Sequence, residues 1–264
     1  MDDGVLLIPA RPTATAGLLA GAAALRGMEV RALDAGPGAL SAALTGRSVH
    51  WCGGPAAGAR VAGPLGIGLL EPPDDWLAGL PWWATGRGIR LTGLGEARAS
   101  LRGPAFVKPP REKSFPAAVY ADGSALPELP ADTPVLVSEV VDFAAEYRLF
   151  LLDGGIAAAS RYAVHGRLDS APLDADPRAP EVRAFAARLA AEAGGGLPSA
   201  VTVDIGFIAG GAGSGGGRPA VVEANMAWFS NCYAADPSGV LDTVLRAAGP
   251  RERVPGADLA FVRV

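Results

Sequence analysis

The stretch Pro219–Asn231, PAVVEANMAWFSN, places a carboxylate and an amide at the end of an apolar run. Side chains alternate along a strand, so Glu223 and Asn225 should point to the same face. An earlier apolar run, VTVDIGF, carries Asp204 near its middle, and a hairpin between the two runs would bring Asp204 to the pair. Two carboxylates and one amide oxygen form an oxygen-only site that suits Mg²⁺ rather than Zn²⁺. In the competing interpretation, Asp204 caps a strand end and Glu223 pairs with an arginine.

The composition indicates a globular chain of one large or two small domains, with 264 residues of which 50% are hydrophobic and 19% charged. A net charge of −4 argues against nucleic acid as the main partner. Two cysteines without a CxxC motif fit a reducing compartment, and we expect both thiols to be buried. No signal-peptide pattern and no apolar run of about 20 residues is present. We therefore expect a cytoplasmic protein without a membrane partner; the sequence does not indicate its oligomeric state.

The first part of the chain predicts a small parallel α/β unit. Val5–Ile8 and Glu29–Leu33 are predicted strands on either side of a helix at Thr13–Arg26. No GxGxxG follows the first strand, which disfavours a dinucleotide-binding fold. Residues 35–100 are rich in glycine and proline, with one predicted strand at Ser48–Trp51. Three tryptophans in this region are expected to pack between domains rather than to bind substrate: Trp76, Trp82 and Trp83.

The rest of the chain predicts mostly strands. Asp153-Gly154-Gly155 is a strong turn signal between two of them. Helices are predicted at Ala179–Ala193 and at Asp236–Ala248, where Asp236 is the cap and Pro237 takes the first position. The run AGGAGSGGG at 209–217 lacks the following Lys-Ser/Thr and helix of a phosphate loop, and predicts a flexible hairpin tip. The predicted strands are Ala105–Lys108, Ala117–Tyr120, Pro134–Val141, Glu146–Leu152, Ile156–Tyr162, Val201–Ile208 and Pro219–Glu223.

Lysine is rare in this chain: of 23 basic residues only Lys108 and Lys113 are lysines. Lys108 ends a predicted strand, from which its flexible ammonium can reach the α- and β-phosphates of a nucleotide. Lys113 and Ser114 lie on a loop that can fold over a triphosphate, and Pro109 and Pro110 stiffen the start of this loop.

The segment SEVVDFAAEYRLF carries a second group of polar residues. Glu146 can accept hydrogen bonds from ribose hydroxyls, and Val140 and Val141 can offer main-chain groups and an apolar floor to adenine. Arg148, and Arg161 on the neighbouring strand, are expected to face the same cleft, where two guanidinium groups suit phosphate or carboxylate oxygens. The competing interpretation is a cross-strand ion pair between Glu146 and Arg161, which contributes under about 1 kcal/mol when exposed.

The order of these parts resembles an ATP-grasp domain. The segments FVKPPREKSFPAAVY, SEVVDFAAEYRLF and SRY resemble, more narrowly, the small ATP-grasp clade named for two arginines and a lysine, over roughly residues 70–245. The resemblance implies an α+β fold in which two antiparallel α+β subdomains sandwich ATP, preceded by a small α/β domain. We therefore expect an N-terminal domain at 1–100 and an ATP-grasp domain at 101–264, with subdomains at about 101–141 and 142–264.

The resemblance also implies roles in nucleotide binding. Lys108 would hold phosphates, and Glu146 would bind ribose. The adenine hinge would consist of Glu139, Val140 and Val141. Many ATP-grasp enzymes carry a second lysine before the strand-end lysine, whereas this sequence has none there. Arg87 or Arg90 takes its place, or the site does without one.

Catalytic and metal-binding roles follow from the same resemblance. Asp204, Glu223 and Asn225 would bind Mg²⁺. Arg148 and Arg161 match the arginines of the clade and would contact phosphate or the acyl phosphate, and Lys113 matches its lysine in the covering loop. This loop departs from the usual glycine-rich pattern, and glycines lengthen the link between Asp204 and Glu223.

The sequence thus predicts an Mg²⁺- and ATP-dependent carboxylate–amine ligase that forms ADP and acts through an acyl phosphate. Its partners would be a small carboxylate and an amine, with amino acids or peptides suggested by analogy. Two alternatives stay open: a kinase-like phosphotransferase acting on a small molecule, and a non-catalytic nucleotide-binding module. His165, in YAVHGRLDS, is expected to be a solvated loop residue rather than a general base or substrate ligand.

Overall fold

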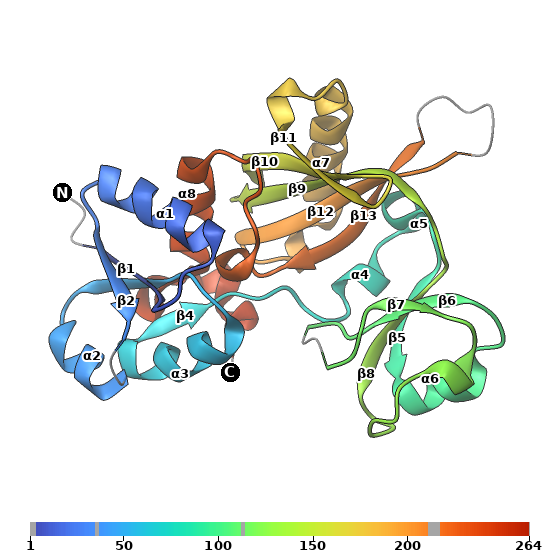
Figure 1. The fold of residues 1–264 in the computed structure, drawn as a ribbon, viewed down its shortest axis with the longest axis horizontal. Helices are drawn as coiled ribbons and strands as arrows, with labels where there is room; N and C mark the ends of the chain where they lie inside the picture. Colours follow the sequence, from blue (N-terminus) through green and yellow to red (C-terminus); the bar gives the residue numbers. More distant parts are fainter. Residues whose placement is uncertain (1–3, 35–36, 112–113, 211–216, 264) are drawn as a thin grey trace.

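The computed structural model of the chain describes residues 4–34, 37–111, 114–210 and 217–263. These residues form sheets of three, four and five strands and a two-stranded ribbon. The three-stranded sheet lies at one end of the molecule and the four-stranded sheet at the other, with the five-stranded sheet above and between them (Figure 1). The Gly-rich run joining the last two strands of the large sheet lies mostly outside the described residues.

The N-terminal unit is a parallel sheet with the strand order β2-β1-β3. Its strands are β1 (Gly4–Pro9), β2 (Glu29–Leu33) and β3 (Ser48–Trp51), and its helices are α1 (Ala14–Leu25), α2 (Pro37–Ala43) and α3 (Pro55–Leu65). Thr13 caps α1, since its side chain accepts a hydrogen bond of 3.1 Å from the amide of Ala16. The βαβ arrangement predicted for this part of the chain is confirmed.

The four-stranded sheet is antiparallel, with the order β5-β8-β6-β7. Its strands are β5 (Ile89–Gly93), β6 (Ala105–Lys108), β7 (Ala118–Tyr120) and β8 (Pro134–Ser138), and α6 (Leu94–Ser100) packs on one face. Strand β5 was not predicted, and it lies before residue 101, where the second domain was expected to begin. Strand β8 ends at Ser138 rather than at Val141, so the predicted hinge residues belong to a connection between the two large sheets.

The five-stranded sheet is antiparallel, with the order β11-β10-β9-β12-β13. Its strands are β9 (Phe143–Leu152), β10 (Gly155–Val164), β11 (Arg167–Pro172), β12 (Ala200–Ile208) and β13 (Arg218–Asn225). Asp153 and Gly154 both adopt positive φ angles, 49° and 79°, at the turn between β9 and β10. Such a two-residue turn matches the twist of a hairpin, which explains the Asp-Gly signal.

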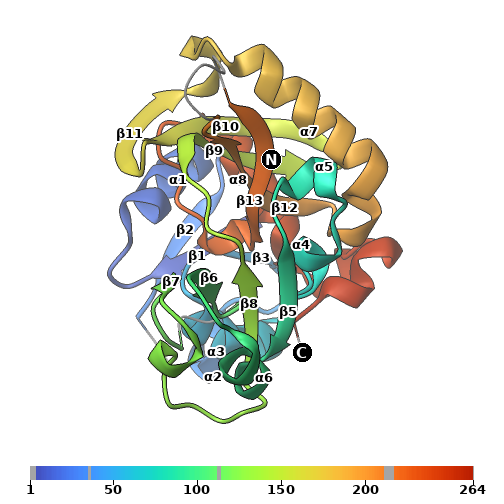
Figure 2. The same ribbon diagram turned by 90° about the vertical axis from the view of Figure 1, so that its right-hand side faces the viewer.

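The alternation of side chains along β9 separates the two faces of this sheet. Tyr147 and Leu149 pack into a core with α7 (Ala179–Ala193), whereas Phe150 packs into another with α8 (Pro237–Ala247). Glu146 and Arg148 share the face of Phe150 by strand parity. On that face Glu146 lines a cavity between the five-stranded and four-stranded sheets. The four-stranded sheet lies below the five-stranded one in Figure 2.

The C-terminal part of the chain shares one core with the N-terminal unit. Leu19 of α1 and Leu241 of α8 are fully buried in the same cluster. Strand β14 (Ala248–Pro250) pairs with β4 (Ile67–Leu69), and Trp228 donates a 2.9 Å hydrogen bond to the carbonyl of Leu70. The N-terminal unit and the five-stranded sheet are therefore not separate packing units.

The tryptophan cluster lies on the segment that joins these parts. Helices α4 (Trp76–Gly79) and α5 (Trp82–Thr85) pack toward α7: Trp76 is buried, and the ring of Trp83 lies 5.7 Å from that of Phe185. Both therefore join the first 100 residues to the later part of the chain. Trp82 differs, because 61% of its surface is exposed.

Candidate functional site

A cavity of about 340 Å³ separates the four-stranded and five-stranded sheets. Phe106, Val119 and Leu136 of the four-stranded sheet give this cavity apolar walls. The structure also brings six of the predicted site residues to this cavity from both sheets and from their connection: Lys108, Glu139, Val140, Val141, Glu146 and Glu223. One carboxylate oxygen of Glu139, Oε2, already accepts a 2.7 Å hydrogen bond from the amide of Gly88.

The three predicted metal ligands lie together on the β12–β13 pair. Asp204 is directly opposite Glu223 in the ladder, and Asn225 is opposite Thr202. The amide nitrogen of Asn225 donates a 2.7 Å hydrogen bond to Oε1 of Glu223. A register shift follows Asp204, so both Val222 and Glu223 line the cavity.

Each carboxylate of this group is paired with a cation of the chain itself. Lys108 Nζ forms an ion pair with Oε2 of Glu223, across the cleft between the two sheets. Arg148 binds Asp204 with two parallel hydrogen bonds of 2.9 and 2.7 Å. Desolvation opposes ionisation of Glu223, but Lys108 and Asn225 outweigh it and hold the pKa of Glu223 below its usual value. The cluster is therefore close to neutral, and the partner of Glu223 is a lysine rather than the arginine of the competing interpretation.

Two tyrosines form a wall next to this cluster. Tyr162 donates a 2.8 Å hydrogen bond to Glu146 and stacks on Tyr233, with ring centroids 5.1 Å apart. The guanidinium of Arg148 lies over both rings, at 5.6 and 5.3 Å. Burial, together with the charges of Asp204 and Glu223, raises the pKa of Glu146, although the bond from Tyr162 opposes this shift.

Arg87 lies at the back of the cavity, whereas Arg90 pairs with Glu96 on α6 at 3.7 Å. Arg87 is 6% exposed and donates hydrogen bonds to Ser138 and to three backbone carbonyls, those of Thr85, Val221 and Val222. Burial lowers the pKa of Arg87 to about 10. Of the two arginines that were alternatives for a missing lysine, Arg87 is the one that reaches the cavity.

The prediction that Arg148 and Arg161 face the same cleft is wrong. Arg161 is paired in register with Tyr147, on the α7 side of the sheet, and its guanidinium binds Asp169 at 2.7 Å and Asp176 at 2.5 Å. The cross-strand pair of Glu146 with Arg161 is not formed either, because the two side chains lie on opposite faces. The physical reason is an irregularity in β10 between Ile156 and Ala158, which shifts the pairing by one residue and inverts the side chains that follow it.

A second cavity, of about 580 Å³, continues from the first one and is lined by residues 109–111 and 114–116. Lys108 and Glu223 line both cavities, and Asn225 lines the second. On the loop side its walls include Arg111 and Ser114. Lys113, predicted to lie in the covering loop, is outside the described residues.

A family model of the ATP-grasp domain matches residues 85–243; it describes family 2 of the clade named for two arginines and a lysine. The chain belongs to this ATP-grasp clade. The match confirms the resemblance seen in the segments that carry the lysine, glutamate and arginine residues. It also includes strand β5, which was not predicted from the sequence.

Solved structures support the ATP-grasp fold over nearly the whole chain. A RimK domain ATP-grasp protein from Sphaerobacter thermophilus aligns with a TM-score of 0.53 at 20% identity, covering 91% of this chain and 99% of that one. The D-alanine–D-alanine ligase from Bacillus anthracis aligns with a TM-score of 0.54 at 13% identity, covering 95% and 98%. No curated protein gives a significant match. Within the described residues of this ATP-grasp chain, no helix has both the length and the apolar character needed to cross a membrane.

The donor set of the ATP-grasp site fits Mg²⁺. Among the described residues, no three His, Cys, Asp or Glu side chains gather as a metal-binding group. The candidate set is instead two carboxylates, Asp204 and Glu223, and the amide oxygen of Asn225. Hard oxygens in this small number suit Mg²⁺, which usually completes its shell with water and substrate phosphates. The two carboxylates already attract cations, as their pairing with Lys108 and Arg148 shows.

Three aromatic residues of the site were not predicted: Phe143, Tyr162 and Tyr233. Tyr162 lies inside the SRY segment. It follows Arg161 in the strand and so points to the opposite face, which would have identified it once the register was known. Tyr233 has a φ of 49°, which a non-glycine residue rarely adopts, and no sequence pattern signals it. His165 is exposed at the β10–β11 turn, as expected of a solvated loop residue.

Proposed function

We propose that the protein is an Mg²⁺- and ATP-dependent ligase that joins a carboxylate to an amine through an acyl phosphate and releases ADP. One observation carries this proposal: Asp204, Glu223 and Asn225 lie side by side on β12 and β13, and Glu223, paired with the strand-end Lys108, lines both cavities. This arrangement provides oxygen ligands for a metal and an ammonium for phosphates at the same place. Membership of the ATP-grasp family and a fold shared with the D-alanine–D-alanine ligase support the ligase class.

The cavity of about 340 Å³ would hold the nucleoside. Adenine would lie between the apolar walls of the small sheet and the main chain at Val140 and Val141. Glu146 would accept hydrogen bonds from the ribose hydroxyls, in the place where it now accepts one from Tyr162. Arg87 adds a buried positive charge at the back of this cavity.

The triphosphate would extend past Lys108 into the second cavity. Lys108 would exchange Glu223 for phosphate oxygens, and Arg148 would stabilise the negative charge that develops during transfer. Mg²⁺, held by Asp204, Glu223 and Asn225, would neutralise phosphate charge. Lys113 keeps its predicted role in the covering loop, whereas the geometry gives no support to a catalytic role for Arg161.

The reaction would proceed in two transfers. An oxygen of the substrate carboxylate attacks the γ-phosphorus, and ADP leaves with the electron pair of the broken P–O bond. The nitrogen of the amine then attacks the acyl carbon, phosphate leaves with its electron pair, and the nitrogen loses a proton. Water would compete with the amine, so exclusion of water beneath the loop at 109–116 is the expected contribution of that loop.

The proposal is tested by an ADP-release screen with Mg²⁺-ATP. Amino acids and small carboxylates are offered in pairs, and products are identified by mass. We expect ADP release to need both partners and the product mass to equal their sum minus water. Glu223→Gln should abolish turnover while the protein stays folded, and Glu192→Gln, on the outer face of α7, is the matched control.

The other outcomes select the alternatives. A stable phosphorylated product formed without an amine would identify a kinase-like phosphotransferase. Tight ATP binding without ADP release for any pair would indicate a binding module. Full ADP production by Glu223→Gln would remove the metal assignment.

A further inference from the structure

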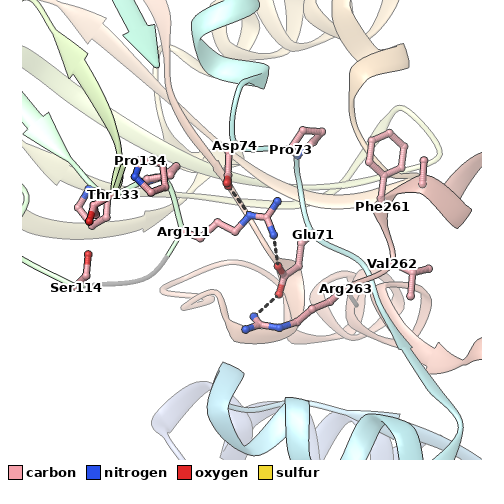
Figure 3. A pocket seen from close by; sticks show the side chains of 13 residues that line it. Glu71, Pro73, Asp74, Arg111, Ser114, Thr133, Pro134, Phe261, Val262 and Arg263 are labelled. Carbon is pink, nitrogen blue, oxygen red and sulfur yellow. Dashed lines mark hydrogen bonds and ion pairs between the residues drawn. The ribbon is translucent and has the colours of Figure 1, made fainter. Parts of the chain in front are cut away.

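A third cavity, of about 610 Å³, has Arg111 and Ser114 among the residues that line it (Figure 3). Four separate segments line it: the linker after β4, the loop after β6, the residues before β8, and the C-terminal tail. Pro73 and Phe261 contribute apolar surface, and Ser114 and Thr133 contribute hydroxyls. Of these residues Ser114 also lines the second cavity, whereas Pro73, Thr133 and Phe261 line neither of the two cavities described above.

The cavity contains two carboxylates and two guanidinium groups. Arg111 forms an ion pair with Asp74 and lies 3.7 Å from Oε2 of Glu71, and Arg263 donates a 2.8 Å hydrogen bond to Oε1 of Glu71 (Figure 3). These four formal charges sum to zero. A ligand with one positive and one negative group would match the cavity without adding net charge.

Glu71 is the least satisfied member of this group. Its side chain is only 4% exposed, and among the described residues its Oε2 atom is buried without a hydrogen-bond partner. A buried carboxylate oxygen that accepts no hydrogen bond is costly, and native proteins contain few of them. Arg111 is near enough for Coulomb attraction but makes no hydrogen bond to this oxygen, so the position favours one further N–H donor.

The cavity is also connected to the proposed reaction site. It shares Pro109, Pro110, Arg111 and Ser114 with the second cavity, which reaches Lys108 and Glu223. A ligand held here would lie next to the cavity proposed for the triphosphate, because these four residues line both cavities. This is a suitable position for a second substrate.

We propose that this cavity binds the amine substrate as a zwitterion, namely an α-amino acid or a short peptide, with its ammonium at Glu71 and Asp74 and its carboxylate at Arg111. The assignment rests on the proposed ligase function and adds to it the location and charge pattern of the acceptor. Arg111 suits the carboxylate because its side chain is 48% exposed, so one edge of its guanidinium remains open to a ligand. Pro73 and Phe261 would contact the apolar part of the substrate.

Direct binding tests this site without relying on turnover. The probes are L-alanine, L-alanyl-L-alanine and two derivatives that each lack one charge, N-acetyl-L-alanine and L-alanine methyl ester, titrated by NMR into the full chain. We expect a zwitterion to bind, and each derivative to bind at least about tenfold more weakly, because one charge-assisted hydrogen bond is lost. Glu71→Gln should weaken zwitterion binding by a similar factor and leave ATP binding unchanged.

Two further variants and a control keep the result unambiguous. Asp74→Asn and Arg111→Met lie at more exposed positions and test the same site if Glu71→Gln fails to fold. Glu192→Gln is the neutral control, since it removes a carboxylate of similar size from α7. If no zwitterion binds at tens of millimolar, or if the blocked derivatives bind as well as the zwitterion, the proposal is overturned. A negative ADP screen combined with charge-dependent binding would instead overturn the ligase function and leave the zwitterion site standing.

Discussion

Lys108 and Glu223 meet from different sheets, and their ion pair joins the two walls of the proposed nucleotide cavity. The ammonium is 14% exposed and the carboxylate 29% exposed, so both are partly shielded from water. In such surroundings a charge contributes more to binding an anion than it would at an open surface. Lys108 is therefore the residue whose loss should separate phosphate recognition from nucleoside recognition.

We expect Lys108→Met to lower the affinity for ATP at least about tenfold while changing that for adenosine by less than about threefold, since adenosine has no phosphate. Isothermal titration calorimetry with both ligands measures the difference. The single variant leaves Glu223 without its partner, so Lys108→Met combined with Glu223→Gln is the control for that effect. An equal loss for the two ligands would contradict the phosphate role.

Cys52 offers a prediction about pH. It is 4% exposed, and burial together with the neighbouring Cys232 raises its pKa to about 12, from an ordinary value of 9.0. Below pH 9.0, the ordinary pKa, the thiol keeps its proton in both the folded and the unfolded chain, so it does not make stability depend on pH. Between the two values only the unfolded chain loses it, and stability should fall as pH rises, by at most roughly 1.4 kcal/mol per pH unit.

Urea unfolding of wild type and Cys52→Ala at pH 8 and pH 10 measures this contribution. The free energy of unfolding should decline more steeply for wild type, because the variant has no thiol at this position to titrate. Parallel declines in the two proteins would show that Cys52 does not contribute.

The sequence was sufficient to predict Lys108, Glu223 and Asn225 as neighbours, because these residues lie at strand ends or along an uninterrupted alternation. It was not sufficient for Arg161. A regular hairpin closed by the Asp153–Gly154 turn would pair Arg161 with Glu146 on the site face, and only the irregularity in β10 moves it to the face of Tyr147. A single extra residue in a strand has no sequence signature here, although it decides that Arg148 lies on the site face of the sheet and Arg161 on the other face.

At the scale of elements, a glycine of β12 leaves room for an aromatic ring of the neighbouring strand β9. A Cβ atom at Gly206 would overlap the ring of Phe143, which lines the cavity and stacks beneath Arg87 at 5.3 Å. We expect Gly206→Ala to push this ring toward the nucleotide position. It should lower stability by about 1–3 kcal/mol and weaken ATP binding as well.

Thermal unfolding and ATP titration of Gly206→Ala test this prediction. Gly21→Ala, in the middle of α1, is the matched control because nothing lies within 4 Å of the added methyl group. The control should be neutral or stabilising by up to about 1 kcal/mol. Unchanged ATP affinity in a folded Gly206→Ala variant would show that Phe143 is not part of the binding surface.

Elements with a clear periodicity were predicted well, whereas in the glycine- and proline-rich residues 35–100 only β3 was predicted. Helix α7 matches its prediction at both ends, because its apolar positions recur with helical spacing and glycines follow it. Strand β5 was missed, because its five residues lie in a region rich in glycine and proline and two of them, Arg90 and Thr92, are polar. It is a strand because it pairs with β8 along its whole length, which is information from another part of the chain.

At the scale of the whole molecule, the N-terminal unit and the five-stranded sheet share the core that contains Leu19, Phe150 and Leu241. The core of the four-stranded sheet, around Val107 and Val135, is separate. We therefore expect amides of β1 and β12 to lose protection at the same denaturant concentration, and amides of β6 to exchange independently.

Hydrogen exchange read by mass spectrometry in increasing urea measures all three regions in one sample. Removal of residues 251–264 should lower the midpoint of the shared unit, because Asp258 accepts hydrogen bonds from the amide and side chain of Ser199 and Arg263 pairs with Glu71. If β1 opens at lower urea than β12, the N-terminal unit is an autonomous domain and the shared core does not determine cooperativity.

The pairing of Asp204 and Glu223 with Arg148 and Lys108 means that this protein supplies its own counter-ions at rest. A free divalent ion arriving alone would have to evict an ammonium whose attraction is already in place, and would gain little by doing so. A magnesium–nucleotide complex instead brings phosphate oxygens to which Lys108 can transfer as the metal takes its position. The resting enzyme should therefore be indifferent to chelators and to millimolar magnesium, and metal and nucleotide should enter together as a single complex.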